Sequence, residues 1–301
     1  MISRNDVETI NDIALQMISI RNFSAAQYNF RQNAKKNPSF LTFNNLGVYY
    51  ITEGIELPNG KVHSARKLGL KYLKRAEAYS QSQLNLMAIG DVYFNEKSYD
   101  VASDYFRRAC KFNDYYISLN NLGASLYMLG KYEEASTNFQ NALSHCNCSD
   151  YSDIYPAKST IYSSYAFSVV HYNKEESLDI LHRMLKSDIS HIEVDEFVLA
   201  YLCNDLLLAK KLCQRMFDSW HVDASVMAMV FDCLFMLKEG NEAEKYLNYQ
   251  LKHLAGYDYN TKPEIYRLKK SFSQHDYRKE EIANFQYSPP LIKGCHYVGS
   301  K

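Results

Sequence analysis

The chain has 301 residues, which is long enough for two ordinary domains or one repeat array. Its 34 basic and 34 acidic residues balance, so the composition carries no electrostatic footprint for nucleic acid binding. No apolar run of about 18 residues predicts a membrane span, and the polar N-terminus does not read as a signal peptide. The 7 Cys are odd in number and scattered, which favours reduced thiols in a cytoplasmic protein.

Helical periodicity begins at Val7, where apolar residues recur three and four positions apart through residue 20. A turn at 21–23 leads into a second helix, and Pro38 closes this first pair before the next one begins. With only 6 Pro and 11 Gly, the chain has little material for a β-rich fold. The sequence therefore predicts consecutive antiparallel helix pairs.

A short block of asparagines, leucine and glycine occurs twice, at 44–47 and at 120–123. After the second block, Ala135, Phe139 and Ala142 follow at the spacing of a partner helix, and an earlier pair repeats this spacing around Gly90. Gly90 and Gly123 lie 33 residues apart. Small residues at these positions let two helices approach closely, and the phenylalanine fills the space that remains.

This spacing resembles the helix–turn–helix pattern of tetratricopeptide repeats, whose period is about 34 residues. The resemblance implies an all-α fold, a right-handed α-solenoid of stacked antiparallel helix pairs, because one repeat cannot bury its own apolar face. It covers residues 1–149 as four repeats or repeat-like pairs, and 150–255 as diverged helix pairs of the same kind. Residues 256–301 are expected to form a polar capping helix and an extended tail with paired prolines.

The second repeat contains extra residues. Gly47 and Gly69 lie 22 residues apart, against 12 for Gly90 and Ala102, which predicts a loop insertion at about 53–64. The turn residues of Leu57 to Gly60 support this interpretation. Such an insertion is either a binding element on one face of a solenoid or a tolerated surface loop.

In tetratricopeptide repeat proteins the first helix of each pair lines a concave groove. Carrying those positions over implies peptide- or protein-binding residues at Asn44, Met87, Asp91, Phe94, Asn120, Tyr127 and Met128. An asparagine suits a peptide main chain, because its amide both donates and accepts hydrogen bonds. Asn45 and Asn121 match an asparagine of the repeat pattern that serves packing, so Asn44 and Asn120 are the preferred groove residues. Lys and Arg are missing from the clamp positions, so a neutral or apolar segment fits this groove better than a C-terminal carboxylate.

No motif predicts catalysis, a cofactor or a metal. Phosphate-loop, dinucleotide, zinc-helix and nucleophile-elbow patterns are absent from the sequence. Ser64 and Lys67 match a short nucleophile pattern without its partner motifs. Residues 145–148 and 295–296 contain His and Cys, but their spacing does not match a structural zinc site.

The function expected from the resemblance is a non-enzymatic scaffold or adaptor that binds a peptide or protein segment in its groove. The alternative is a regulatory sensor similar to bacterial tetratricopeptide regulators that respond to small peptides. The repeats begin near residue 7, so such a sensor would lack a DNA-binding domain and act through protein contacts. A further hypothesis is that the apolar tail, around Tyr287 to Ile292, occupies the groove of its own chain.

Overall fold

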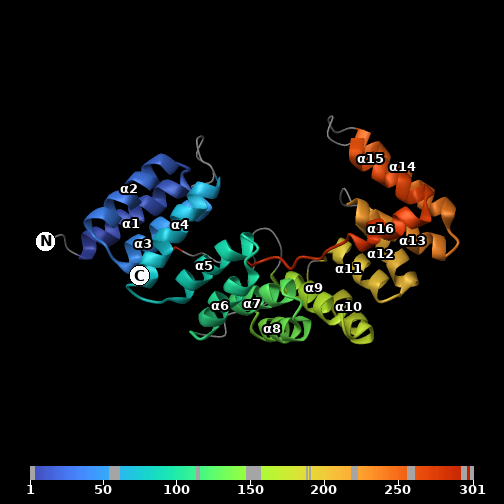
Figure 1. Cartoon of the computed structure of the whole chain (residues 1–301), viewed down its shortest axis with the longest axis horizontal. Helices are drawn as coiled ribbons and strands as arrows, with labels where there is room; N and C mark the ends of the chain where they lie inside the picture. Colours follow the sequence, from blue (N-terminus) through green and yellow to red (C-terminus); the bar gives the residue numbers. More distant parts are fainter. Residues whose placement is uncertain are drawn as a thin grey trace. The chain divides into compact units, whose positions relative to one another are not determined.

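The structure is a computed structural model that describes residues 4–53, 62–112, 116–146, 157–187, 189, 191–217, 223–255, 262–292 and 297–298. All regular secondary structure in these ranges is helical, as the sequence predicts. The chain forms two compact units, with unit 1 comprising residues 1–131 and 291–301, and unit 2 comprising residues 132–290. Figure 1 labels the helices of each unit in chain order. The expected boundaries at 149 and 255 stay a prediction about domain organisation.

Unit 1 contains three packed helix pairs and a seventh helix. Its helices are α1 (Arg4–Ser19), α2 (Phe23–Lys36), α3 (Phe40–Thr52), α4 (Val62–Glu77), α5 (Gln83–Asn95), α6 (Tyr99–Cys110) and α7 (Tyr116–Met128). Helix α1 packs on α2, α3 on α4, and α5 on α6. Short polar caps set the helix starts, as at Ser39, whose side chain accepts from the Thr42 N–H in a capping box.

Glycines let the helices of unit 1 approach closely. A Cβ placed on Gly47 would lie 2.7 Å from Cγ of Leu73, and one on Gly90 would lie 2.5 Å from the Phe106 ring. A side chain of any size at these positions would push the paired helices apart. Gly47 also faces Gly69 of α4, so these two helices pair although an inserted segment separates them in the sequence. The predicted insertion at 53–64 itself lies largely outside the described residues.

Within the described ranges, five turns after helices close with the same hydrogen bonds. In each, one residue has a positive φ: Arg21, Lys97, Gly130, Asn204 and Lys238. Its N–H bonds the carbonyl three residues back, and the next N–H bonds the carbonyl five residues back, as in Lys131 N to Leu126 O at 2.9 Å. This is the Schellman motif, which ends a helix with a left-handed residue and favours glycine there. Two of these turns lie in unit 2, where the repeat pattern in the sequence is weak.

Unit 2 contains the remaining helices. They are α8 (Tyr132–His145), α9 (Ala157–Val169), α10 (Lys174–Lys186), α11 (Glu193–Leu202), α12 (Leu206–Phe217), α13 (Ala224–Met236), α14 (Gly240–Ala255), α15 (Lys262–Ser273) and α16 (His275–Ala283). Helix α11 packs on α12, and α13 packs on α14. Helices α15 and α16 both pack on α13. Where the sequence analysis expects one capping helix, two short helices form, because Gln274 is extended with φ −121° and ψ 112°.

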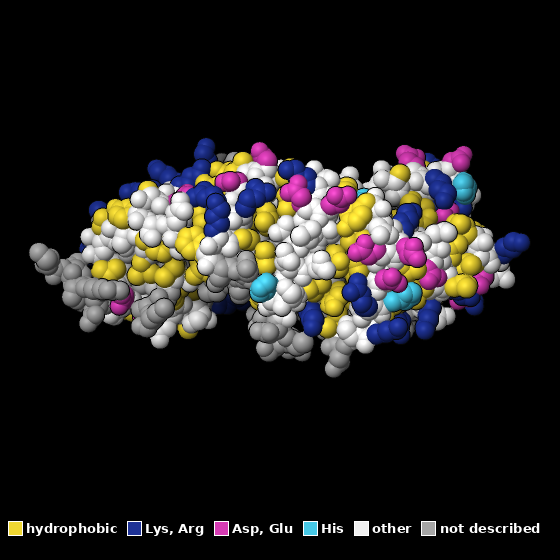
Figure 2. Space-filling view, turned by 90° about the horizontal axis from the view of Figure 1, so that it is seen from below, with side chains coloured by type: hydrophobic (Ala, Val, Ile, Leu, Met, Phe, Trp, Pro, Cys, Tyr) yellow, Lys and Arg dark blue, Asp and Glu magenta, His cyan; other side chains and the backbone are white. Residues whose placement is uncertain are grey.

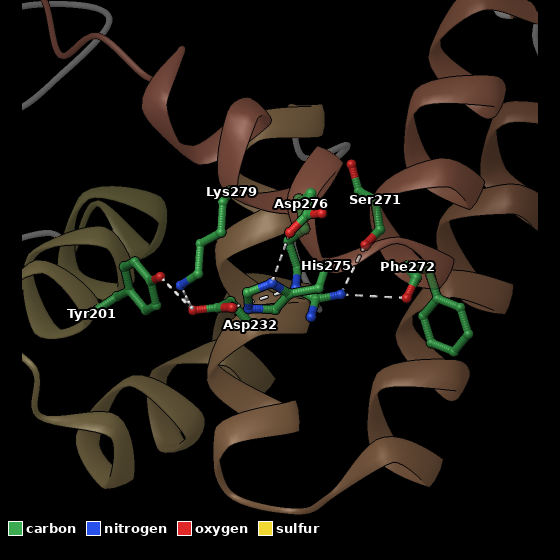
Figure 3. A network of polar contacts seen from close by, with 8 residues as sticks. Tyr201, Asp232, Ser271, Phe272, His275, Asp276 and Lys279 are labelled. Atoms are coloured by element: carbon green, nitrogen blue, oxygen red, sulfur yellow. Dashed lines mark hydrogen bonds and ion pairs between the residues drawn. The ribbon is translucent and has the colours of Figure 1, made fainter.

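A buried carboxylate fastens the last helix of unit 2 to its core (Figure 3). Asp232 of α13 accepts from Lys279 Nζ at 2.8 Å, from the Tyr201 hydroxyl at 2.8 Å and from Arg278 Nε at 3.4 Å. Arg278 also donates through Nη1 to the Ser271 carbonyl at 3.0 Å. Side chains of Asp232 and Arg278 are 3% and 6% exposed. The polar residues of α16 thus supply the cap that closes the apolar face of α13.

Candidate peptide-binding face

The C-terminal tail is defined as residues 286–301, and its residues 286–292, which follow α16, form no helix (Figure 1). Its first part belongs to unit 2, where the Tyr287 ring stacks on Phe167 with ring centres 3.7 Å apart. The Tyr287 hydroxyl lies 3.1 Å from Oγ of Ser164, and Pro289 is buried. The paired prolines remove backbone donors, which keeps this segment out of a helix.

In unit 1, two asparagine side chains hold the main chain of the tail. Asn121 of α7 accepts from the Ile292 N–H at 3.0 Å and donates to the Ile292 carbonyl at 3.2 Å. Asn45 of α3 does the same for Val298, at 2.8 Å and 2.7 Å. Each amide therefore satisfies the N–H and the carbonyl of one tail residue, as a neighbouring β-strand would. Ile292 and Val298 of the tail thus lie against helices of their own chain in unit 1, whereas occupation of a peptide-binding groove by the tail stays a prediction.

Other polar side chains orient these two amides. Asn44 donates to Oδ1 of Asn45 at 3.2 Å, and Asn120 donates to Oδ1 of Asn121 at 3.1 Å. Asn45 donates in turn to Oδ1 of Asn11 at 2.6 Å. Because each partner fixes which end of the amide faces the tail, the network presets a donor and an acceptor for a main chain.

Apolar contacts accompany the main-chain bonds. Ile292 is buried, and the Tyr297 ring lies nearly parallel to that of Phe30, with centres 6.1 Å apart. The Tyr297 hydroxyl lies 3.2 Å from Oγ1 of Thr52. We call Asn11, Phe30, Asn45, Thr52 and Asn121 the tail-binding face. Its tail contacts come from neutral side chains, so an anionic or cationic ligand gains no ion pair from them.

The residues predicted to bind a peptide fall into two groups. Asn44, Met87, Asn120 and Tyr127 are buried within unit 1, whereas Asp91, Phe94 and Met128 are partly exposed. Asp91 is joined to the face, since Asn121 Nδ2 lies 3.4 Å from its Oδ1. Whether these residues bind an external partner stays a prediction.

The tail contacts use Asn45 and Asn121, which the sequence analysis assigned to packing in preference to Asn44 and Asn120. Helix rotation explains this difference. An α-helix turns by about 100° per residue, so Asn45, two positions before Gly47, points away from α4, which Gly47 faces. Asn44 points to the side, where it accepts from Asn85 Nδ2 at 3.1 Å. The number of positions between each asparagine and Gly47 therefore indicates, from the sequence alone, that Asn45 is on the helix side opposite α4.

Chemistry other than binding has little support in the described residues. No three His, Cys, Asp or Glu side chains gather there as a metal site requires. Five cysteines within the described ranges are free thiols. The side chain of Ser64 and residues 147–148 and 295–296, named above for a nucleophile pattern and for metal binding, lie outside the described part of the chain. None of the described helices is long and apolar enough to cross a membrane.

Antiparallel helix pairs with small residues at their crossings and Schellman turns between their helices define an α-solenoid. Its fold is that of the tetratricopeptide repeat proteins, and the resemblance found in the sequence is confirmed at the level of fold. A tetratricopeptide repeat protein from Parabacteroides merdae superimposes with a TM-score of 0.59 at 15% identity, over 89% of this chain and 100% of its own.

A chain of the APC/C hetero-tetramer Cut9-Hcn1 superimposes with a TM-score of 0.51 at 15% identity, over 93% of this chain and 43% of its own. No protein-family profile matches the sequence, and no curated protein matches it. At these identities the likeness establishes the fold and leaves the ligand to be inferred from this chain's own contacts.

Proposed function

We propose that the protein is a scaffold or adaptor that binds an extended segment of a partner protein on the tail-binding face of unit 1. One observation carries this proposal: Asn45 and Asn121 each pair with the N–H and the carbonyl of a single tail residue. Main-chain recognition of this kind accepts any extended segment, while apolar contacts at neighbouring positions supply selectivity. A binding role rather than catalysis follows from this arrangement.

The tail indicates what the partner segment looks like. Ile292 contacts Asn121 and Val298 contacts Asn45, so the two held residues lie six positions apart in the sequence. The buried Ile292 side chain and the Tyr297 ring mark where the partner needs apolar side chains. Because the tail-binding face offers neutral contacts, the partner segment is neutral at its centre.

The tail itself competes with such a partner. It is tethered to the protein, so its effective concentration at the face is on the order of millimolar. A partner therefore binds the full chain more weakly than it binds a chain ending at Phe285. Release of the tail is the step that opens the face.

Binding of a labelled peptide of residues 286–301 to a chain ending at Phe285 tests the proposal. Asn45→Ala and Asn121→Ala each remove two hydrogen bonds to the peptide, worth roughly 1–3 kcal/mol together, so affinity falls by about 5- to 150-fold. Asn29→Ala is the matched control, because among the described residues its amide bonds the Ala25 carbonyl of its own helix, at 3.0 Å, and no tail residue. Fluorescence anisotropy measures all three.

A second arm tests the contact atom by atom. N-methylation of Ile292 in the peptide removes the N–H that Asn121 accepts, so it weakens binding to the unaltered face. In the Asn121→Ala variant the same methyl group has a smaller effect, because the side-chain oxygen that accepts this hydrogen bond is already missing. Equal effects in both backgrounds, or unchanged affinity in both asparagine variants, would show that the peptide binds elsewhere.

A further inference from the structure

A second surface of unit 1 has a different chemistry from the tail-binding face. A hollow of about 880 Å³ opens between α2, α3 and α4, and its lining includes Gln27, Tyr28, Arg31, Lys35, Tyr72 and Arg75. This volume lies in the range of ligand pockets, and the hollow is open to solvent rather than enclosed. We call it the basic hollow, because the charged residues in its described lining are all Arg or Lys.

Positive charge gathers on the two helices that border the hollow. Helix α2 carries three basic residues and no acidic one, and α4 carries five Lys or Arg against a single Glu. The whole chain has a formal net charge of zero, so this excess is local. Figure 2 shows one face of the molecule, on which several Lys and Arg side chains lie at the upper left with apolar and a few acidic side chains among them.

The cations of the hollow are not neutralised by the described part of the chain. No ion pair joins Arg31, Lys35 or Arg75 to a carboxylate in those ranges. Elsewhere the protein pairs its basic residues, as in Lys210 with Glu239 at 2.6 Å and Arg267 with Glu281 at 2.5 Å. Three exposed cations around one hollow therefore create a positive potential there.

Stacking positions one of these cations. The Arg75 guanidinium lies over the Phe43 ring at 4.2 Å from its centre. The contact restrains the guanidinium at the rim of the hollow, and a guanidinium can bind a carboxylate through two parallel hydrogen bonds. Gln27, on the opposite wall, adds amide groups for the polar main chain of a ligand.

The aromatic residues of the hollow indicate which of two anionic ligands fits it, an acidic protein segment or a single-stranded nucleic acid. A nucleic acid needs ring faces on which its bases stack. Here the Tyr72 ring already stacks on Phe43 and Tyr50, with centres 6.2 Å and 5.9 Å apart, and Arg75 covers Phe43. Tyr28 extends into solvent at the rim, 64% exposed. Two of the three lining rings are thus engaged within the protein, which favours carboxylates as the ligand.

We propose that the basic hollow docks an Asp- and Glu-rich segment of a partner protein, through Arg31, Lys35 and Arg75. This surface is distinct from the tail-binding face, since none of the residues Asn11, Phe30, Asn45, Thr52 and Asn121 lines the hollow. An acidic segment there and a neutral segment on the tail-binding face give one unit two contacts of opposite character.

The test uses the full chain and a labelled peptide of alternating Asp and Ala, with an Asn and Ala peptide as the uncharged control. The acidic peptide binds at low salt, and the uncharged one does not. In the double variant Arg31→Glu, Arg75→Glu the affinity for the acidic peptide falls at least tenfold. The control Lys36→Glu, Lys67→Glu changes net charge equally on the same two helices, outside the hollow lining, and loses less than threefold.

Several results would overturn the proposal: equal loss in both double variants, no binding of the acidic peptide, or tighter binding of oligothymidine or of a phosphoserine peptide. If the first double variant fails to fold by circular dichroism, Arg31→Gln with Lys35→Gln replaces it, because both residues are exposed on α2. Asn121→Ala leaves acidic-peptide binding unchanged, which separates this site from the tail-binding face.

Discussion

The C-terminal part of the chain is held by two different chemistries in the two units. In unit 2, α16 is fastened by buried charges, with Asp232 contacting Arg278 and Lys279 and with Glu281 contacting Arg267. In unit 1, the tail is held by neutral amides that contact its main chain. Buried charges are costly to separate, whereas any extended chain can replace a main-chain partner. The first arrangement is suited to permanent closure and the second to exchange.

The largest expected effect comes from removing the buried carboxylate. Asp232→Ala leaves Arg278 buried without its counter-charge, which destabilises unit 2 by about 3–5 kcal/mol. Urea unfolding followed by circular dichroism measures this loss. Asp276→Asn is the control, because that side chain is exposed and contacts only His275, and it changes stability by less than about 0.5 kcal/mol. A small effect of Asp232→Ala would remove the contrast between the units.

Acid distinguishes the two chemistries without a mutation. Burial raises the pKa of Asp232, but hydrogen bonds from Lys279 and Tyr201 together outweigh this effect. The pKa of Asp232 therefore lies below the ordinary value. Hydrogen bonds from Arg267 lower the pKa of Glu281. Both groups contribute stability that is present above their unfolded pKa values, near pH 4, and is lost as pH falls through the folded ones.

The Asn45–Val298 contact contains no titrating group, so the same acidification leaves it in place until unit 1 unfolds. Hydrogen exchange read by mass spectrometry follows α16 and the tail separately in one titration. Exposure of α16 before the tail supports the comparison. Loss of tail protection first, at a pH where α16 is still protected, would contradict it.

The smallest expected effect concerns the Schellman turns. Lys97 of unit 1 has a left-handed backbone conformation, which is strained for a residue with a Cβ. Lys97→Gly removes this strain and stabilises the protein by about 1 kcal/mol. Asn204→Gly in unit 2 gains less, because asparagine tolerates this conformation better than lysine does. Urea midpoints of the two variants, with Lys97→Ala as the control that keeps a Cβ, test whether the turns of both units are built alike. An equal gain from Lys97→Ala would exclude backbone strain as the cause.

Local spacing predicts the helix pairs well, because Gly90 and Phe106 meet within one hairpin and their chemistry is visible in the sequence. The roles of Asn45 and Asn121 were harder to assign, since the choice depends on helix rotation and on a tail residue up to 253 positions away. The basic hollow was missed for a related reason. Lys35 and Arg75 lie far apart in the sequence, and only the packing of α2 and α4 on α3 brings them to one hollow.

The order of the tail contacts has a consequence for protein synthesis. Asn45 and Asn121 precede the tail in the chain by most of its length, and domains fold in order as they leave the ribosome. The tail-binding face is therefore complete before Ile292 and Val298 have been translated. A partner present during translation meets an open face, and one that arrives later has to displace the tail. The rate at which a partner binds thus depends on whether it arrives before or after the tail has been synthesised.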